Sequence, residues 1–247
     1  MFTGIDYETY YDKDCSITHG LNNYLKHDLF DAYMVSIYSA DNFAWVGHPK
    51  DAPWEKLEGH VALSHNRSFD QPVHEHLIKA GIIPQTNFAE WHCTADMSAY
   101  CGYPRSLKES LKHSLGVVMS KEIRDNMKGR QFDELDHEEK LDLAKYALFD
   151  AKGCACLWEK ESDKWPAWER ELSQETTRMC WEGVPVDKEA MEKAVNTLSQ
   201  KIFDAIEVLP WTEEQAGALS PKEWSAYCRS QGKEPPTSMA KDDPEVI

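Results

Sequence analysis

Apolar residues fall into short runs in the first half of the chain, and these runs predict strands. We expect strands over residues 2–8, 33–38, 43–46, 60–63 and 90–93, and the second and third of these are rich in the β-branched and aromatic residues typical of strands. Asp41 and Asn42 supply turn chemistry for a hairpin between the second and third runs. The first run passes into polar and aromatic residues, so we expect a strand that leads into a loop.

Other segments repeat their apolar residues at helical spacing. Phe69, Val73, Leu77 and Ala80 recur with an i, i+4 rhythm that Gly81 ends. By similar patterns we expect helices at residues 69–80, 95–100, 106–115, 137–161, 169–181 and 188–206, and a short helix near residues 54–57. Strands that come first, interleaved with helices that later dominate, predict an α/β fold with a mixed central sheet flanked by helices.

Two breaks divide the helical second half. Trp165-Pro166 marks a domain boundary, and Gly183-Val184-Pro185 interrupts the helical pattern again. We therefore predict a first domain over residues 1–165 and a helical C-terminal extension over residues 166–247. Past Leu209 the pattern thins into short polar helical pieces, and residues 235–247 are poor in apolar residues and predicted to be extended.

Composition is that of a soluble globular protein, with 41% hydrophobic and 28% charged residues. No apolar run approaches the roughly eighteen residues that span a bilayer, and the N-terminus carries acids where a signal peptide carries lysines. We expect a cytoplasmic protein without a membrane partner. The seven cysteines have no paired C-x-x-C spacing, which favours free thiols over a zinc site or disulfides.

The formal net charge of −16 is opposite to the basic excess that usually holds a phosphate backbone. Metal-dependent phosphodiesterases, however, concentrate carboxylates, and bound divalent cations reverse the local sign of the charge. The charge therefore argues against tight binding of DNA without excluding DNA as a substrate.

Asp6 and Glu8 are the first residues that suggest chemistry. They lie two apart on a predicted strand, so both side chains project from the same face. Two adjacent carboxylates repel each other unless a cation lies between them, and hard oxygen ligands suit Mg²⁺ or Mn²⁺. Taken alone, such a pair is more often a solvated surface feature.

Two further acidic positions have structural explanations of their own. Asp70 follows a predicted strand and begins a helix, where an aspartate complements the helix dipole, and Asn66 suits a turn or cap. Tyr146 and Asp150 lie on one face of the helix predicted over residues 137–161, in an apolar stretch where an aspartate needs a partner. A packed tyrosine and an aspartate bonded to an amide or a lysine remain an alternative.

The order of these elements resembles the three motifs of the DEDD exonuclease superfamily, which has a ribonuclease-H-like fold. D-x-E comes first, N-x-x-x-D follows a later strand, and Y-x-x-x-D lies on a late helix. Tyr146 is similar to the tyrosine of the DEDDy subgroup. The resemblance covers roughly residues 1–160 and is strongest to the 3′–5′ proofreading domain of family A DNA polymerases, particularly those of bacteriophages. If the chain is phage-encoded, its location is the host cytoplasm.

The C-terminal third resembles the start of the thumb in the same polymerases. Met179, Gly183 and Asp187 match its M-x-x-x-G-x-x-x-D stretch, and residues 219–236 match the next piece more loosely. No palm or fingers segment follows, so we expect no polymerisation. A separate polymerase subunit is an implied partner.

The resemblance also implies roles for the site residues. Two divalent cations, Mg²⁺ or Mn²⁺, would be held by four carboxylates, those of Asp6, Glu8, Asp70 and Asp150. Tyr146 would orient the attacking water, and Thr9 and Asn66 would contact the substrate. Nucleoside 5′-monophosphates would leave one at a time from a single-stranded or frayed 3′ end of DNA. The aromatic residues Tyr10, Tyr11 and Phe69 suit either stacking on bases or core packing.

Two alternatives stay open. An RNA- or oligonucleotide-directed DEDD exonuclease would use the same fold and metals, and the polymerase-like tail argues for DNA instead. A catalytically silent structural or partner-binding domain is the other, and the presence of all four carboxylates and the tyrosine argues against it.

Overall fold

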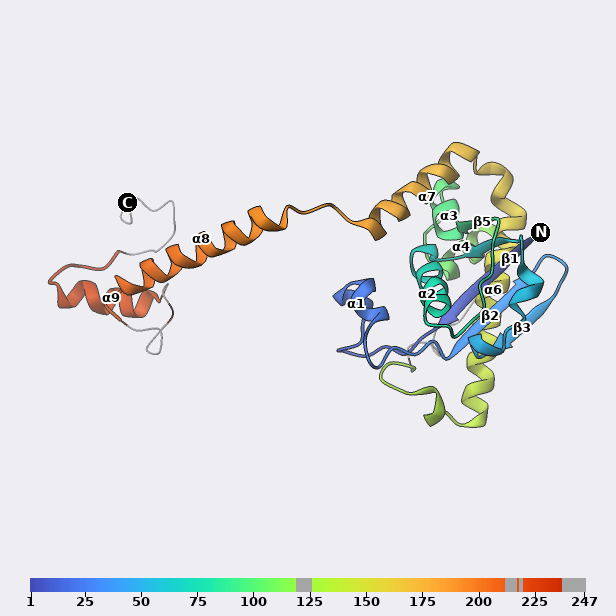
Figure 1. The fold of residues 1–247 in the computed structure, drawn as a ribbon, viewed down its shortest axis with the longest axis horizontal. Coiled ribbons are helices and arrows are strands. Elements are labelled where there is room, and N and C mark those ends of the chain that lie inside the picture. Colours follow the sequence, from blue (N-terminus) through green and yellow to red (C-terminus); the bar gives the residue numbers. More distant parts are fainter. Residues whose placement is uncertain (119–125, 212–216, 218–219, 237–247) are drawn as a thin grey trace. The chain divides into compact units, whose positions relative to one another are not determined.

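The computed structural model describes residues 1–118, 126–211, 217 and 220–236. Its sheet has five strands: β1 (Phe2–Glu8), β2 (Met34–Ser39), β3 (Ala44–Gly47), β4 (Val61–Ser64) and β5 (Glu90–Cys93). They lie in the order β3-β2-β1-β4-β5 (Figure 1). Strand β2 is antiparallel to both of its neighbours, β1 and β3, whereas β4 and β5 run parallel to β1. This mixed sheet has the ribonuclease-H-like arrangement, which confirms the predicted fold class.

Helices alternate with these strands along the chain and then follow them. In the described residues they are α1 (Leu21–Leu25), α2 (Arg67–Lys79), α3 (Thr94–Tyr100), α4 (Leu107–Leu115), α6 (His137–Glu161), α7 (Ala167–Glu182), α8 (Lys188–Glu207) and α9 (Pro221–Ser230). Short 3₁₀ turns cover Ile17–His19, Pro49–Asp51, Trp54–Leu57, Phe132–Glu134 and Ser162–Lys164. The predicted helices are present with ends shifted by a few residues, and α1 is an addition.

Local signals start and stop these helices. Asp136 and Glu139 form a reciprocal capping box at the start of α6, the longest helix described. Ser106 caps α4, which ends at Gly116 in the left-handed conformation. The ends of both helices are therefore set by chain-local chemistry, which explains why the sequence predicts them well.

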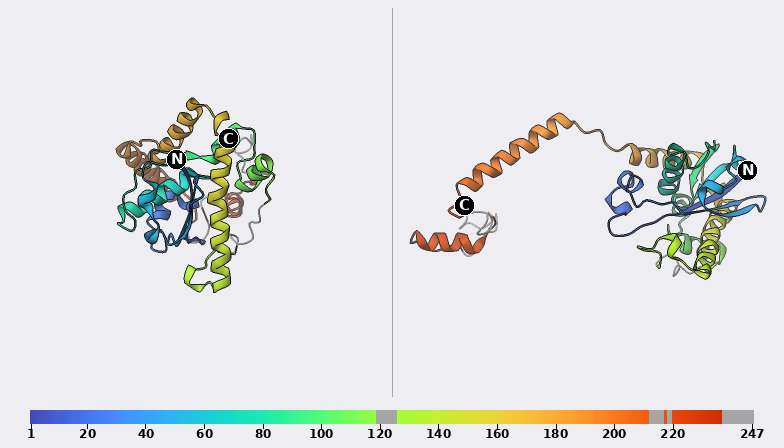
Figure 2. Two further views of the ribbon diagram at one scale, coloured as in Figure 1. Left: turned by 90° about the vertical axis from the view of Figure 1, so that its right-hand side faces the viewer. Right: turned by 60° about the horizontal axis from the view of Figure 1, so that its bottom comes forward.

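Helices α2 and α6 cover opposite faces of the sheet (Figure 2). The alternation of β1 separates its side chains between them. Gly4 lies against Ala151 of α6, whereas the Tyr7 hydroxyl lies 2.8 Å from Nδ1 of His74 on α2. Because Asp6 and Glu8 have the same parity as Gly4, their carboxylates face α6.

The core under α2 is aromatic. His74 is 2% exposed, and its ring lies 4.9 Å from that of Trp54, 5.4 Å from Phe88 and 5.6 Å from Trp91. Burial lowers the pKa of His74 to about 4, so the ring is neutral at physiological pH. This packing holds α2, and with it Asp70, against β1.

The chain divides into two compact units, Met1–Gly183 and Val184–Ile247. The first unit thus extends past the boundary that the sequence predicts at residue 165, because α7 packs on it. Ser173 Oγ donates to Asp96 at 2.5 Å, and Trp181 Nε1 donates to the main-chain oxygen of Ser68 at 3.3 Å. The second unit holds α8 and α9, and its likeness to a polymerase thumb stays a prediction.

Most of the tail that the sequence predicts to be extended, residues 237–247, lies outside the described residues, as does position 219 of the thumb-like stretch. All seven cysteines are free thiols. Within the described part of the chain, no helix combines the length and the apolarity that a membrane span requires.

Candidate active site

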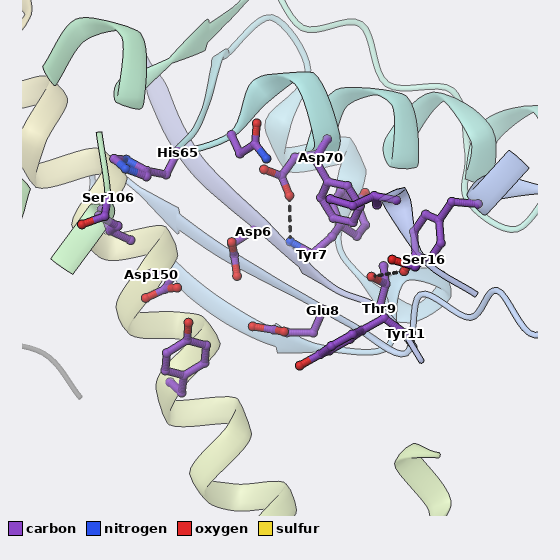
Figure 3. Close-up of a pocket in the computed structure, with 16 residues that line it drawn as sticks. Asp6, Tyr7, Glu8, Thr9, Tyr11, Ser16, His65, Asp70, Ser106 and Asp150 are labelled. Carbon is purple, nitrogen blue, oxygen red and sulfur yellow. Dashed lines mark hydrogen bonds between the residues drawn. The ribbon is translucent and has the colours of Figure 1, made fainter. Parts of the chain in front are cut away.

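One cleft, of about 390 Å³, gathers the residues that the sequence singles out (Figure 3). Its walls come from β1 and the segment after it, α1, the turn from β4 into α2, the start of α4, and α6. All seven predicted site residues line it: Asp6, Glu8, Thr9, Asn66, Asp70, Tyr146 and Asp150. Segments more than a hundred residues apart in sequence therefore meet in one place.

The contact between β1 and α6 brings the first and last motifs together. A Cβ at Gly4 would collide with the main-chain oxygen of Ala151, so α6 lies directly on the strand. On the neighbouring strand β2, Ser36 Oγ donates to the main-chain oxygen of Ala147 at 2.7 Å. Asp150 precedes Ala151, and Figure 3 shows its side chain projecting into the same space as those of Asp6 and Glu8.

Asp70 reaches the cleft from the first turn of α2. Its carboxyl is 3% exposed and accepts a hydrogen bond from the Tyr7 N–H of β1 at 3.2 Å. Burial raises the pKa of Asp70 to about 7, the charge of Asp150 adds to the shift, and the hydrogen bond from the Tyr7 N–H opposes it. Besides its place in the first turn of α2, Asp70 thus links this helix to β1 through the Tyr7 N–H.

Tyr146 lies one turn before Asp150 on α6 and is 7% exposed. Burial raises the pKa of its phenol, and the charges of Asp150, Glu8 and Asp6 raise it further, so the phenol keeps its proton. Burial raises the pKa of the Cys154 thiol, which lies one turn beyond Asp150, and the charges of Asp6, Asp150 and Asp70 raise it further. The acidic side chains are thus close enough to form one electrostatic cluster.

The donor set of this cluster suits a hard divalent cation. Carboxylate oxygens on a strand and two helices are the ligands that Mg²⁺ and Mn²⁺ prefer, and the described cleft lining contains no Lys or Arg. The residue types in the cleft therefore fit a hard divalent cation. Among the residues that the structure describes, no three His, Cys, Asp or Glu side chains are already arranged as a metal-binding group.

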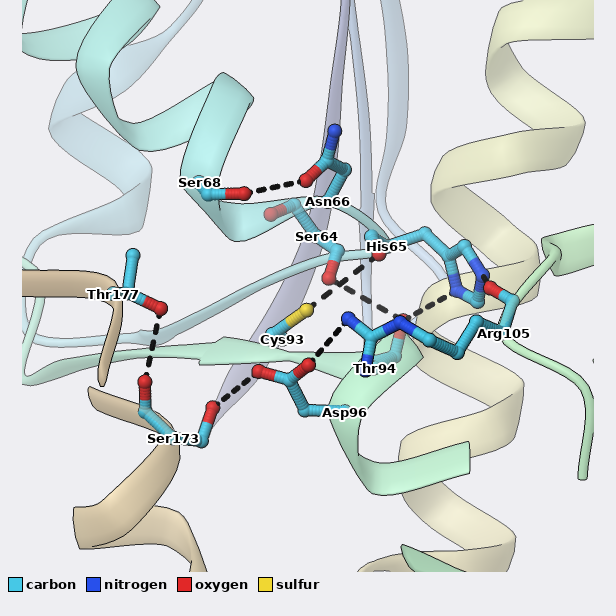
Figure 4. A network of polar contacts seen from close by, with 10 residues as sticks. All are labelled: Ser64, His65, Asn66, Ser68, Cys93, Thr94, Asp96, Arg105, Ser173 and Thr177. Carbon is cyan, nitrogen blue, oxygen red and sulfur yellow. Dashed lines mark hydrogen bonds and ion pairs between the residues drawn. The ribbon is translucent and has the colours of Figure 1, made fainter. Parts of the chain in front are cut away.

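His65 lies in the cleft, although the sequence suggests no role for it. Its Nε2 donates to the main-chain oxygen of Arg105 at 2.6 Å, and its Nδ1 lies 3.0 Å from Thr94 Oγ. Arg105 in turn pairs with Asp96 at 2.5 Å, which also accepts from Ser173 of α7 (Figure 4). This network fixes the loop before α4, whose first residues line the cleft.

Aromatic rings line the other end of the cleft. Tyr11, Tyr24 and Phe69 belong to this lining. Tyr10, which the sequence also suggests for stacking, is 6% exposed and donates its hydroxyl proton to Asp12 at 2.8 Å, so it is a packing residue. Tyr24 lies on α1, a helix of five residues with no periodic signal in the sequence.

No family model and no curated protein matches the chain. Among solved structures it resembles Brucella melitensis NrnC bound to pGG, with 20% identity, a TM-score of 0.45, and coverage of 72% of this chain and 80% of that one. Escherichia coli RNase D, an exoribonuclease involved in structured RNA processing, matches with 17% identity and a TM-score of 0.46 over 74% of this chain and 45% of that one.

The POL domain of Pol1 from M. smegmatis, in complex with a DNA primer-template and dNTP, matches with 14% identity and a TM-score of 0.47. The match covers 99% of this chain and 40% of that domain's chain. Likenesses of this size identify neither an activity nor a substrate, so the functional argument depends on the cleft.

Proposed function

We propose that this protein is a metal-dependent 3′–5′ exonuclease that removes nucleoside 5′-monophosphates from the 3′ ends of DNA. The observation that supports this most is the convergence of four carboxylates and one phenol, from β1, α2 and α6, on a single cleft. The order of the motifs supports the proofreading type found in family A polymerases.

The carboxylates would act as metal ligands. Asp6 and Glu8 project from one face of β1, and Asp70 and Asp150 face them from α2 and α6. Two bound Mg²⁺ or Mn²⁺ ions would neutralise phosphate charge and make a water molecule nucleophilic near neutral pH. Asp70, whose pKa burial raises to about 7, would give up its proton when such a cation binds.

Tyr146 would orient the attacking water. Its pKa is raised by burial and by the neighbouring carboxylates, so the neutral phenol is a hydrogen-bonding group and a poor base. One turn separates it from Asp150, which places the phenol beside the ligand cluster.

The size of the cleft favours an unpaired end. A volume of about 390 Å³ is in the range of sites that bind one small ligand, and a terminus must be unpaired to bring its last phosphodiester among carboxylates that lie deep in the cleft. The rings of Tyr11 and Phe69 would stack on bases, and Thr9 and Asn66 would contact the substrate. A single-stranded or frayed terminus is therefore the expected substrate.

Digestion of matched, 5′-labelled DNA and RNA single strands tests the proposal, with Mn²⁺ and with a chelator. We expect a ladder that shortens from the 3′ end, needs the metal, and forms faster on DNA. Faster loss of RNA would favour the RNA-directed alternative. No hydrolysis of either strand would leave a structural or partner-binding domain.

A further inference from the structure

A second pocket, of about 630 Å³, lies within the first compact unit. Its lining comes from α1 and its flanking residues, from α2 between Pro72 and Lys79, and from the C-terminal end of α7. The same two helices line the cleft, through Tyr24 of α1 and through Phe69 and Asp70 of α2. The pocket and the cleft are therefore neighbours along α1 and α2, which lie side by side (Figure 1).

The pocket has the cations that the cleft lining lacks. Lys26 follows α1 and Lys79 ends α2, and both residues are exposed. In the part of the chain that the structure describes, neither lysine has an ion-pair partner. Burial and the charge of Lys79 lower the pKa of His76, which also lines the pocket, so this ring is neutral at physiological pH. The two ammonium groups are therefore the groups that can meet an anion.

Two acids belong to the same lining, and one of them is paired. Glu182 forms an ion pair with Arg178 at 2.7 Å. Glu75 accepts a hydrogen bond from the neutral side chain of Gln71 at 2.8 Å. Two unpaired ammonium groups thus act against the single charge of Glu75, so the local balance of charge favours a phosphate.

Trp181 adds a flat apolar surface to the pocket. Its Nε1 donates to the main-chain oxygen of Ser68 at 3.3 Å, and the guanidinium of Arg67 lies 5.4 Å from the centre of its ring. These two contacts fix the ring, and Arg67 leaves one of its faces for a ligand. A fixed aromatic ring beside lysines is the combination that binds a base and its phosphate in single-stranded nucleic acid.

The spacing between the two sites fits a strand. Nine residues separate Asp70 from Lys79 on α2, which is about 14 Å along the helix axis. This is the length of about four stacked nucleotides at a rise of about 3.4 Å each. We propose that the pocket holds the single strand about four nucleotides before its 3′ end, with phosphates on Lys26 and Lys79 and a base on Trp181. This inference rests on the proposed exonuclease function and adds the source of strand affinity in a protein whose net charge is −16.

The test compares the first hydrolysis step on a 5′-labelled dodecamer, which reaches the pocket, and on a dinucleotide, which is too short. Lys26→Ala/Lys79→Ala should raise the KM of the dodecamer about tenfold at low salt, the size of two exposed charge contacts, and leave its kcat and the dinucleotide unchanged. The slope of log KM against log salt should fall by about 1.4, because each contact with a single-strand phosphate contributes about 0.7. Lys50→Ala/Lys56→Ala is the matched control, because these exposed lysines lie outside both linings.

A second readout needs no hydrolysis. Cys180 is exposed and lines the pocket, whereas Cys156 lies outside both linings. In a chelator, the dodecamer should slow the alkylation of Cys180 by iodoacetamide and leave that of Cys156 unchanged. The lysine double variant should lose this protection.

An unchanged KM of the dodecamer in the lysine double variant, or an equal loss on the dinucleotide, would overturn the proposal and leave the exonuclease intact. Protection of Cys180 by a nucleoside 5′-monophosphate as strong as that by the dodecamer would assign the pocket to a free nucleotide and overturn the strand path. A wild type that hydrolyses neither substrate would overturn the proposed function, and alkylation of Cys180 would then decide whether the pocket binds a strand.

Discussion

Gly4 of β1 packs against the main chain of Ala151 of α6, with no room for a Cβ between them. The two residues are far apart in sequence, yet their contact sets the separation of the strand that carries Asp6 and Glu8 from the helix that carries Tyr146 and Asp150. The geometry of the cleft therefore depends on a residue that has no side chain to contribute to it.

Gly4→Ala should separate β1 from α6. Its Cβ meets a main-chain oxygen that cannot rotate away, so we expect a loss of unfolding free energy of about 2–3 kcal/mol or more, together with most of the nuclease activity. Urea unfolding and strand digestion measure the two effects. Gly217→Ala is the control, because a Cβ there meets nothing within 4 Å. A stable and fully active Gly4→Ala protein would show that α6 can shift without affecting the site.

Tyr146→Phe should reduce turnover by about tenfold to a hundredfold, because misplacing an attacking group by about an ångström has effects of that size. The Mn²⁺ concentration that gives half-maximal activity should stay the same, since the phenol is not a proposed ligand. Steady-state kinetics at several Mn²⁺ concentrations separate the two effects. Unchanged turnover would make Tyr146 a packing residue.

Asp70→Asn should stabilise the metal-free protein at alkaline pH. The pKa of Asp70 rises from an ordinary 3.8 to about 7 on folding, so the folded state holds the proton more tightly. The free energy of unfolding therefore falls as the pH rises from about 4 to about 7. Above pH 7 the ionised Asp70 lowers it by about 4 kcal/mol. Asparagine keeps the acceptor for the Tyr7 N–H without the charge.

Urea unfolding in a chelator measures this effect of Asp70. The variant should exceed the wild type in unfolding free energy at pH 8, and the gap should shrink at pH 5. Added Mg²⁺ should stabilise the wild type more than the variant. Equal stabilities at pH 8 in the chelator would mean that the carboxyl is solvated.

His74 should give the opposite dependence on pH. Its pKa falls from 6.5 to about 4 on folding, so its stabilising contribution is present above pH 6.5 and lost as pH falls toward 4, by about 3 kcal/mol. His74→Asn should lower stability overall and flatten the loss between pH 6.5 and 4.5, as urea unfolding at several pH values would show. An unchanged slope would assign the acid sensitivity to other groups.

The sequence predicts the strands and the long helices well, because their apolar spacing and their caps are local signals. It misses α1, since five residues are too few to show a period, and Tyr24 is missed with it. The compact unit ends at Gly183 and not near residue 165, because Pro166 breaks the helix locally while Ser173 still bonds to Asp96. Long-range contacts of this kind leave no trace in local spacing.

The candidate site, like the fold, has features that the sequence predicts and features that only the structure shows. The motifs and the family resemblance predict seven site residues, and the structure brings these seven together in one cleft, while their roles stay a proposal. The sequence leaves open whether Asp70 only complements its helix, and the structure adds that its carboxyl also accepts a hydrogen bond from the Tyr7 N–H of β1. His65 is beyond sequence reasoning, because its bonds go to Arg105 and Thr94, which lie 40 and 29 residues away.

The most direct test of the proposed carboxylate site is the Mn²⁺-dependent digestion of a 5′-labelled single strand by Asp150→Asn, beside the wild type and Asp142→Asn. Asp142 lies on the same helix, pairs with Lys145 at 2.9 Å, and lies outside the cleft lining, so its variant makes the same charge change away from the site. We predict a descending ladder for the wild type and for Asp142→Asn, and an intact strand for a folded Asp150→Asn. A full ladder from Asp150→Asn would contradict the assignment of this cleft as the metal-dependent active site.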